Sequence, residues 1–216
     1  MIGVLSAGIA PGLALLSFFY LKDKYNAEPV SFVLRIFLLG ALLVFPIMFI
    51  QYVFETEGMA GSDFVRAFFI VGLLEEFFKW FILFYFVYQH AHFDEPYDGI
   101  VYGVAVSLGF ATAENILYLF VNGVEHALGR ALLPVSSHAL FGVIMGYYLG
   151  KGKFSLENRN RCLFFSLLFP FFFHGVYDYI LLSIENWIII IVPFMFFLWW
   201  LALRKVKLAH DITISG

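Results

Sequence analysis

Residues 64–88 read FVRAFFIVGLLEEFFKWFILFYFVY, and this stretch decides the fold. It is long enough to cross a bilayer, since a spanning helix needs about 20 mainly apolar residues. Its centre nevertheless carries Glu75, Glu76 and Lys79. An ionisable group in hydrocarbon costs about 2.5–3.5 kcal/mol on insertion scales. The stretch therefore predicts a membrane helix with a polar face that points into a bundle of other helices.

The composition of the whole chain indicates the same environment. Hydrophobic residues make up 62% of the 216 residues and charged residues only 13%, whereas soluble domains carry about 25% charged residues. A soluble protein of this length could not hide so much apolar surface from water, so the surrounding solvent must be lipid. The net charge of −3 gives no indication of nucleic-acid binding, and a single cysteine excludes an internal disulfide. The length predicts one domain, residues 1–216.

Seven segments are long and apolar enough to span a bilayer, and short polar breaks separate them. We therefore predict an all-α, polytopic membrane bundle of about seven helices. A six-helix arrangement stays open, in which the last two segments form one broken hairpin. The segments are Ile2–Leu21, Phe32–Phe54, Phe64–Tyr88, Tyr97–Val121, Ala127–Leu149, Leu163–Ile184 and Trp187–Leu203.

Lysine and arginine are distributed unevenly over the breaks, which predicts the orientation. One side of the membrane has only Arg66 and Arg130. Because basic loops are the cytoplasmic ones, we expect the N-terminus outside and the C-terminus in the cytoplasm. The basic residues on the expected cytoplasmic side are Lys22, Lys24, Lys151, Lys153, Arg159, Arg161, Arg204, Lys205 and Lys207.

Two segments carry small residues at four-residue intervals, the spacing that lets membrane helices pack closely. Each row also contains polar residues at the same spacing, so these faces are expected to point toward the centre of the bundle. One row is His138, Gly142, Gly146 and Gly150, and the other is Gly99, Gly103, Ser107, Phe110 and Glu114.

Ionisable side chains recur inside four of the segments, and their spacing predicts which of them meet. Glu75 and Lys79 are four residues apart and can pair on one helix face, while Glu76 is turned about 100° away. His174 and Asp178 have the same four-residue spacing, so Asp178 could orient the imidazole. An intramembrane ionisable residue is a functional candidate by default.

Counting residues inward from the expected outer surface places these side chains at similar depths. With a rise of about 1.5 Å per residue, depths of about 15–18 Å are found for one group and about 10 Å for another. Scattered charges on helices that run in alternating directions would have no reason to share a depth. We therefore expect one site in the outer half of the membrane. The deeper group is Glu75, Glu76, His138 and His174, and the shallower group is Glu114 and Asp178.

This set of side chains predicts hydrolytic chemistry. Two histidines with carboxylates form a donor set for zinc, which activates water. A carboxylate can also act alone as a general base toward water. In either case Glu76 or Glu75 would activate the water. With a metal, His138, His174 and Glu76 would bind it. Without a metal, the two histidines would stabilise the negative charge that forms on the carbonyl oxygen of the substrate. A buried polar network that only fixes helix packing is the alternative.

The run His90-Ala91-His92-Phe93-Asp94-Glu95 also has the composition of a metal site. It lies in a break between segments, on the expected cytoplasmic side and away from the other ionisable residues. We interpret it as a solvated loop.

The motif Glu75-Glu76-x-x-Lys79 resembles the double-glutamate signature of the PrsW family of intramembrane proteases. The similarity extends to residues 93–103 (FDEPYDGIVYG), to residues 108–115 (LGFATAEN), to His138 and to the motif that joins His174 to Asp178. It covers nearly the whole chain, from residues 7–12 to residues 197–200.

The resemblance implies a multi-pass protease of the bacterial cell membrane. Such a protease makes the site-1 cut in the extracytoplasmic part of a single-pass membrane anti-sigma factor, RsiW. Envelope stress or antimicrobial peptides trigger the cut, and a second protease then completes release of the sigma factor. The need for a metal stays open, because the family is grouped with metallopeptidases while a metal-free glutamate mechanism is argued for its relatives. The implied catalytic residues are Glu75, Glu76 and His174, followed by Glu114, His138 and Asp178.

Two other functions stay open at this point. A CAAX-type prenyl-peptide protease would take a lipidated substrate from the cytoplasmic side, which the depth estimate disfavours. A transporter, or an immunity-type membrane protein with a polar core, would use the buried charges without cleaving any substrate.

Overall fold

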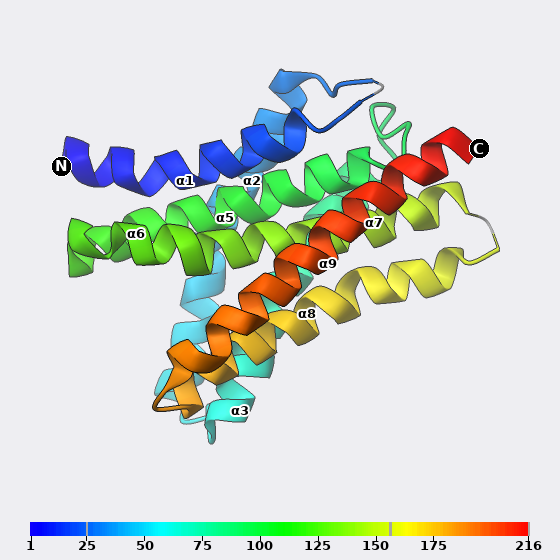
Figure 1. The fold of residues 1–216 in the computed structure, drawn as a ribbon. Helices are drawn as coiled ribbons and strands as arrows, with labels where there is room; N and C mark the ends of the chain where they lie inside the picture. The colour runs from blue at the N-terminus through cyan, green and yellow to red at the C-terminus, as the bar shows by residue number, and fades with distance from the viewer. Residues whose placement is uncertain (25, 156, 216) are drawn as a thin grey trace.

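The structure is a computed structural model that describes residues 1–24, 26–155 and 157–215. In these residues all regular secondary structure is helical. Six helical rods within them are each long and apolar enough to cross a membrane. They are α1 (Ile2–Tyr20), α2 (Val30–Thr56), α5 (Asp98–Asn122), the rod Val124–Phe154, α8 (Arg159–Ser183) and α9 (Trp187–Ser215), as Figure 1 shows.

The segment with the double glutamate forms a seventh rod. It consists of α3 (Asp63–Val65), η1 (Arg66–Leu73), α4 (Leu74–Ile82) and η2 (Leu83–Val87), which follow one another without a break. Both η1 and η2 are π-helical. The rod Val124–Phe154 is built in a similar way, from η3 (Val124–His126), α6 (Ala127–Arg130), the π-helical η4 (Ala131–Val135) and α7 (Ser136–Phe154). The predicted bundle of seven helices is confirmed.

The ends of the chain differ most from the prediction. The α9 helix continues past Leu203, where we expected the last span to end. Lys205, one of the basic residues that follow the apolar run, contacts α7, since its ammonium group donates to the Tyr148 hydroxyl at 3.0 Å. Because α8 and α9 are 25 and 29 residues long, each can span alone, and the six-helix arrangement is wrong.

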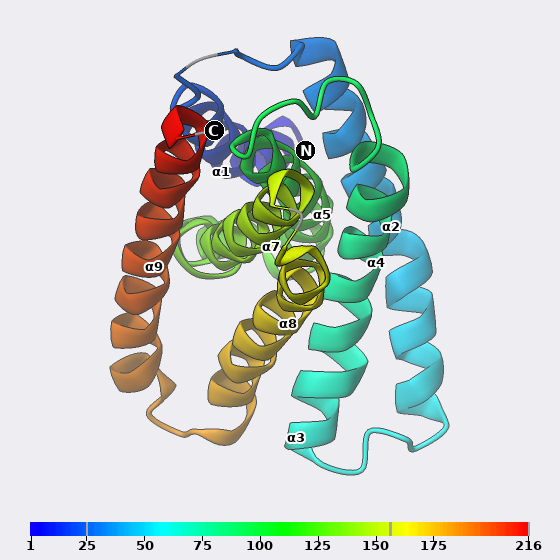
Figure 2. The ribbon, with the colours of Figure 1, turned by 90° about the vertical axis from the view of Figure 1, so that its right-hand side faces the viewer.

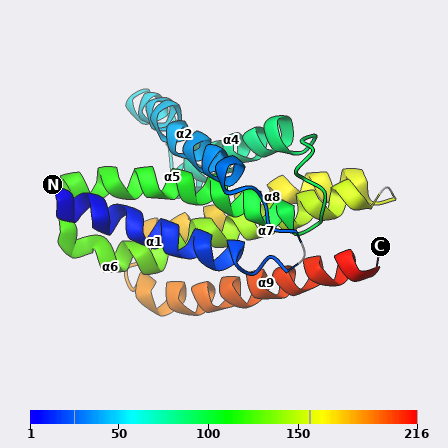
Figure 3. The same cartoon turned by 90° about the horizontal axis from the view of Figure 1, so that it is seen from above.

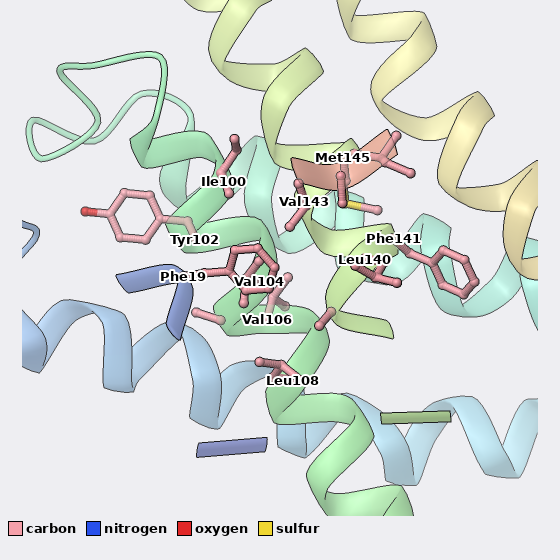
Figure 4. Packing of buried hydrophobic residues seen from close by; sticks show 14 of the residues in the cluster. Phe19, Ile100, Tyr102, Val104, Val106, Leu108, Leu140, Phe141, Val143 and Met145 are labelled. Carbon is pink, nitrogen blue, oxygen red and sulfur yellow. The ribbon is translucent and has the colours of Figure 1, made fainter. Parts of the chain in front are cut away.

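Helices α5 and α7 form the centre of the bundle, and Figure 2 shows the other long helices around them. In their most apolar stretches, 61% of α5 and 78% of the rod that contains α7 are buried, against 17% of α1 and 22% of α9. Buried apolar side chains of the two central helices, such as Val104, Leu108 and Phe141, belong to one hydrophobic cluster (Figure 4). The outer helices expose side chains such as Phe49 and Ile189, which suits a lipid-facing surface.

Glycines allow the two central helices to touch. A Cβ atom on Gly146 would overlap the carbonyl group of Gly99, and one on Gly103 would overlap the carbonyl oxygen of Gly142. The rows of small residues predicted from the sequence therefore face each other, as expected for small-residue packing in membranes.

Gly146→Ala is expected to destabilise the protein by about 1–3 kcal/mol, because the added methyl group meets backbone that can only move by separating the helices. Thermal unfolding of the detergent-solubilised protein measures this as a lower Tm. Gly129→Ala is the matched control, since a Cβ there has no atom within 4 Å. Equal Tm values for the two variants would contradict the close contact.

The termini lie at opposite ends of the bundle, as an odd number of spans requires (Figure 3). The loop between the third and fourth spans differs from the solvated loop that we expected. Phe93 is 3% exposed, and the backbone N–H of Asp94 donates to the buried Asp98 carboxylate at 2.8 Å. The loop is therefore anchored to the start of α5.

Candidate active site

Two of the helices that carry the polar side chains have a π-helical segment just before the site. The π-helix η1 leads directly into α4, which carries Glu75, Glu76 and Lys79. The π-helix η4 leads into α7, which carries His138. Pro134 lies within η4 and lacks the N–H of a regular turn, which accounts for the change there. Such π-bulges are frequent at functional sites.

Lys79 lies at the centre of the cluster and is fully buried. Its ammonium group donates to Glu76 Oε1 at 2.8 Å and to Glu75 Oε2 at 3.3 Å. It lies 3.1 Å from His138 Nδ1 and 4.2 Å from the centre of the Phe110 ring. The predicted pair of Glu75 and Lys79 is confirmed. The expectation that Glu76 points away from Lys79 is wrong, because three residues is also a spacing that brings side chains together on a helix.

His174 lies between two carboxylates. Its Nδ1 atom is 2.9 Å from Glu76 Oε1, and its Nε2 atom is 3.3 Å from Asp178 Oδ2. Glu76 Oε1 accepts from the Nδ1–H group, and the Asp178 carboxylate beside Nε2 favours the protonated form of the imidazole. The Phe141 ring stacks on the imidazole at 5.1 Å. The predicted contact between His174 and Asp178 is confirmed.

His138 connects Lys79 to Glu114. An ammonium group only donates, so Nδ1 of His138 accepts, and the ring proton is assigned to Nε2 from this network. The Nε2 atom lies 3.4 Å from Glu114 Oε2. The His138 and His174 rings are 5.0 Å apart and nearly perpendicular. The structure thus brings all six predicted residues into one connected cluster.

Two members of the cluster were missed at the sequence level. Arg130, from α6, contacts Glu114 Oε1 at 3.2 Å and donates to Asn115 Oδ1 at 2.8 Å. Gln51, from α2, donates to Glu75 Oε1 at 3.2 Å. Arg130 was used only to predict the orientation, from its place near the start of the predicted span Ala127–Leu149, but arginine side chains are long enough to reach inward from a helix end. Gln51 carries no charge and gave no signal in an apolar segment.

The cluster contains one more negative group than positive groups. Its acids are the two glutamates of α4 with Glu114 and Asp178, and its cations are Lys79, Arg130 and His174. Among its acids, Glu114 is the most exposed, with 35% of its side chain accessible, whereas Glu76 is fully buried. Glu75 Oε2 lies 4.0 Å from His138 Nε2 and 3.9 Å from His174 Nε2. These separations are long for direct hydrogen bonds and suit a bridging water.

The same residues fit a metal ion. Glu75, Glu76, His138 and His174 each offer one ligand atom, and the four atoms lie within 4.8 Å of one another. Imidazole nitrogen and carboxylate oxygen are the donor set of hydrolytic zinc sites. Glu76 Oε2 is buried without a hydrogen-bond partner, so it is free to serve as a ligand. Lys79 contacts the same carboxylates, so its charge competes with a metal ion for them.

A multi-pass helical membrane protein that buries carboxylates, imidazoles and an ammonium group in one network has the construction of an intramembrane hydrolase. Comparison with known proteins agrees. Residues 28–202 match the PrsW family of intramembrane metalloproteases, and the chain belongs to this family. It is therefore a peptidase and a multi-pass protein of the cell membrane.

Its relatives match over nearly their whole lengths. Protease PrsW of Geobacillus kaustophilus is 64% identical over 209 residues, which cover 97% of this chain and 93% of the relative. Protease PrsW of Bacillus subtilis is 61% identical over 215 residues, or 99% of both chains. Protease PrsW of Clostridioides difficile is 36% identical over 197 residues, covering 86% of this chain and 82% of the relative. No solved structure matches the chain significantly. Family membership decides against the transporter and CAAX-type alternatives.

Proposed function

We propose that this protease makes the site-1 cut in the extracytoplasmic part of a single-pass membrane anti-sigma factor, and that residues 1–216 act as one protease domain. The observation that carries the proposal is the position of the cluster along the helices. Glu114 is 8 residues from the end of α5, and His174 is 9 residues from the end of α8. Both distances are about 12–14 Å at the rise of a helix. Glu114 and His174 therefore lie nearer the ends that carry few basic residues, which the positive-inside rule assigns to the outside, while Glu75 lies at the middle of its rod.

Glu75 is the proposed general base. Its Oε2 atom lies 4.0 Å from His138 Nε2 and 3.9 Å from His174 Nε2, and its Oε1 atom accepts from Gln51. A water beside Oε2 would give a proton to Glu75 while it attacks the carbonyl carbon of the scissile bond, and Glu75 would return this proton to the amine nitrogen as the C–N bond breaks. The Nε2–H groups of His138 and His174 lie between Glu75 and the carboxylates of Glu114 and Asp178, and we propose that they stabilise the negative charge that develops on the carbonyl oxygen.

The other residues of the cluster hold these groups in place. Glu76 binds Lys79 and His174 together, and Asp178 orients the far side of the His174 ring. A metal ion bound by Glu76, His138 and His174 would supply Lewis-acid polarisation of the water and of the carbonyl group. With or without it, proton transfer to Glu75 is the step that this arrangement favours.

Arg130 is proposed to position Glu114 and, through it, His138. Arg130→Met is expected to lower the cleavage rate by about 10-fold or more, because a 1 Å misplacement of catalytic groups can cost 100-fold. Arg130→Lys keeps the charge but loses the two-pronged contact to Glu114 and Asn115, so only partial recovery is expected. Cleavage in cells, normalised to the membrane level of each variant, measures the effect. Wild-type rates for Arg130→Met would exclude the positioning role.

The proposed substrate is tested by co-expressing the chain with a single-pass anti-sigma factor that carries different tags on its two ends. We expect a membrane-bound stub whose newly formed end, read by mass spectrometry, lies just outside the membrane. A tagged single-pass protein with an unrelated extracytoplasmic segment is the control and should stay intact. An uncut anti-sigma factor, or a cut on the cytoplasmic side, would refute the proposed site-1 function.

A further inference from the structure

A second cluster of carboxylates lies at the other end of α5. Glu28 precedes α2, Asp94 belongs to the loop before α5, and Asp98 is the first residue of α5. One carboxylate oxygen from each lies within 4.8 Å of the others. Glu114 is 16 residues farther along α5, so the two clusters are about 24 Å apart at the rise of a helix. This group is therefore separate from the active site.

The environment of these acids leaves their negative charge without a partner. Glu28 is 3% exposed and Asp98 is fully buried. Throughout the described ranges, no lysine or arginine lies within ion-pair distance of the three carboxylates. Lys153 is nearby, but its ammonium group contacts the His90 carbonyl oxygen at 3.4 Å and the face of the Phe93 ring at 4.5 Å. Burial raises the pKa of the Glu28 carboxyl above its usual value.

Asp98 supplies an independent sign of a missing ligand. Its Oδ2 atom accepts hydrogen bonds from the backbone N–H groups of Asp94 at 2.8 Å and Glu95 at 2.5 Å. Its Oδ1 atom is buried and has no hydrogen-bond partner. A buried oxygen that accepts nothing costs about 1–3 kcal/mol, so such atoms call for an explanation.

Neighbouring groups hold the cluster in shape. The Tyr102 hydroxyl donates to Glu28 Oε2 and lies 3.2 Å from the carbonyl oxygen of His92. The backbone of Glu28 is also fixed, because its carbonyl oxygen accepts from the Tyr20 hydroxyl at 2.7 Å. The carboxylates are thus positioned by the fold before any ligand arrives.

We propose that Glu28, Asp94 and Asp98 bind one hard divalent cation, magnesium or calcium. Both ions prefer carboxylate and carbonyl oxygens, and the cluster offers only oxygen ligands. The cation offsets two of the three negative charges and gives Asp98 Oδ1 a partner. It also ties the entrance of α2 and the loop before α5 to the helix that carries Glu114. The site holds the central helix in place and takes no part in hydrolysis.

The test uses full-length protein in detergent, treated with a chelator and carrying Glu76→Gln to weaken metal binding at the active site. Terbium serves as a luminescent probe for calcium, excited through the adjacent Tyr102. We expect saturation at one ion per chain, and displacement by calcium or magnesium. The ion that displaces terbium at the lower concentration is the preferred one. Either cation should also raise the Tm, since ligands that bind only the folded state stabilise it.

Asp94→Asn and Asp98→Asn are each expected to weaken terbium binding at least 10-fold. Asp94 is exposed, so its variant tests the site even if Asp98→Asn fails to fold. Glu57→Gln, at an exposed acid after α2, is the matched control and should bind as the parent does. Unchanged binding in Asp94→Asn, or no saturable binding in the parent, would overturn the proposal. The buried acids would then be explained by a proton shared between Glu28 and Asp98.

Discussion

Glu75→Gln is expected to reduce substrate cleavage by at least about 100-fold while leaving the fold intact, which is the lower range for losing a general base. The amide has nearly the volume of the carboxyl group, and its oxygen can still accept from Gln51. Lys79 keeps its shorter contact, the one to Glu76. The amide nevertheless cannot take a proton from water, so the proposed chemical step fails.

The measurement is the yield of membrane stub in the co-expression assay, with the amount of protease in the membrane determined by blotting. Glu57→Gln makes the same chemical change at an exposed position outside the cluster and should cleave like the wild type. Glu75→Gln protein that is well expressed and still cleaves at more than about a tenth of the wild-type rate would assign the base to another residue.

Lys79→Met is expected to have the largest effect on stability. Lys79 is the only lysine in the cluster, and it contacts Glu75, Glu76 and His138 from a fully buried position. Removing one partner of a buried ion pair leaves the other charge uncompensated, at a cost of about 3–5 kcal/mol. We expect a much lower Tm in detergent and little protein in the membrane.

A second substitution separates charge from packing. In Lys79→Met with Glu76→Gln, the closest carboxylate is neutralised as well, so the double variant should regain part of the lost Tm although it stays inactive. Such recovery is expected because removing both members of a buried pair costs less than removing one. If the two losses of stability simply add, Lys79 acts through its packing on Phe110 and not through its charge.

The sequence was sufficient to predict the helical bundle and the grouping of the six site residues. Both predictions follow from the apolar interior of a membrane, which requires long apolar helices and makes isolated charges unfavourable. Long apolar runs define the spans, and each buried charge is costly enough to need a partner. Their positions in the same half of the membrane, on helices that run in alternating directions, were then enough to predict that Glu114, His138 and His174 belong to one site. The structure adds the contacts, and the catalytic roles of these residues remain a proposal.

The features that were missed depend on side-chain reach and on backbone details that carry no sequence pattern. Arg130 enters the cluster from a helix end, and Gln51 is one uncharged residue in an apolar run. The contact between Glu76 and Lys79 does follow from their three-residue spacing, and it was missed because only the four-residue pair was considered. The carboxylate cluster around Asp98 was hidden for a different reason, since Glu28 is 70 residues away in the sequence and only the fold brings the two together.

We propose that the buried cluster of this chain itself hydrolyses a peptide bond. The most direct measurement uses purified protein and a purified, doubly tagged single-pass anti-sigma factor, reconstituted together in lipid vesicles with no other protease. We expect the wild-type protein to produce one stub cut just outside the membrane, and Glu75→Gln protein of equal Tm to produce none. Equal cleavage by both proteins, or no cleavage by folded wild-type protein, would contradict the proposal.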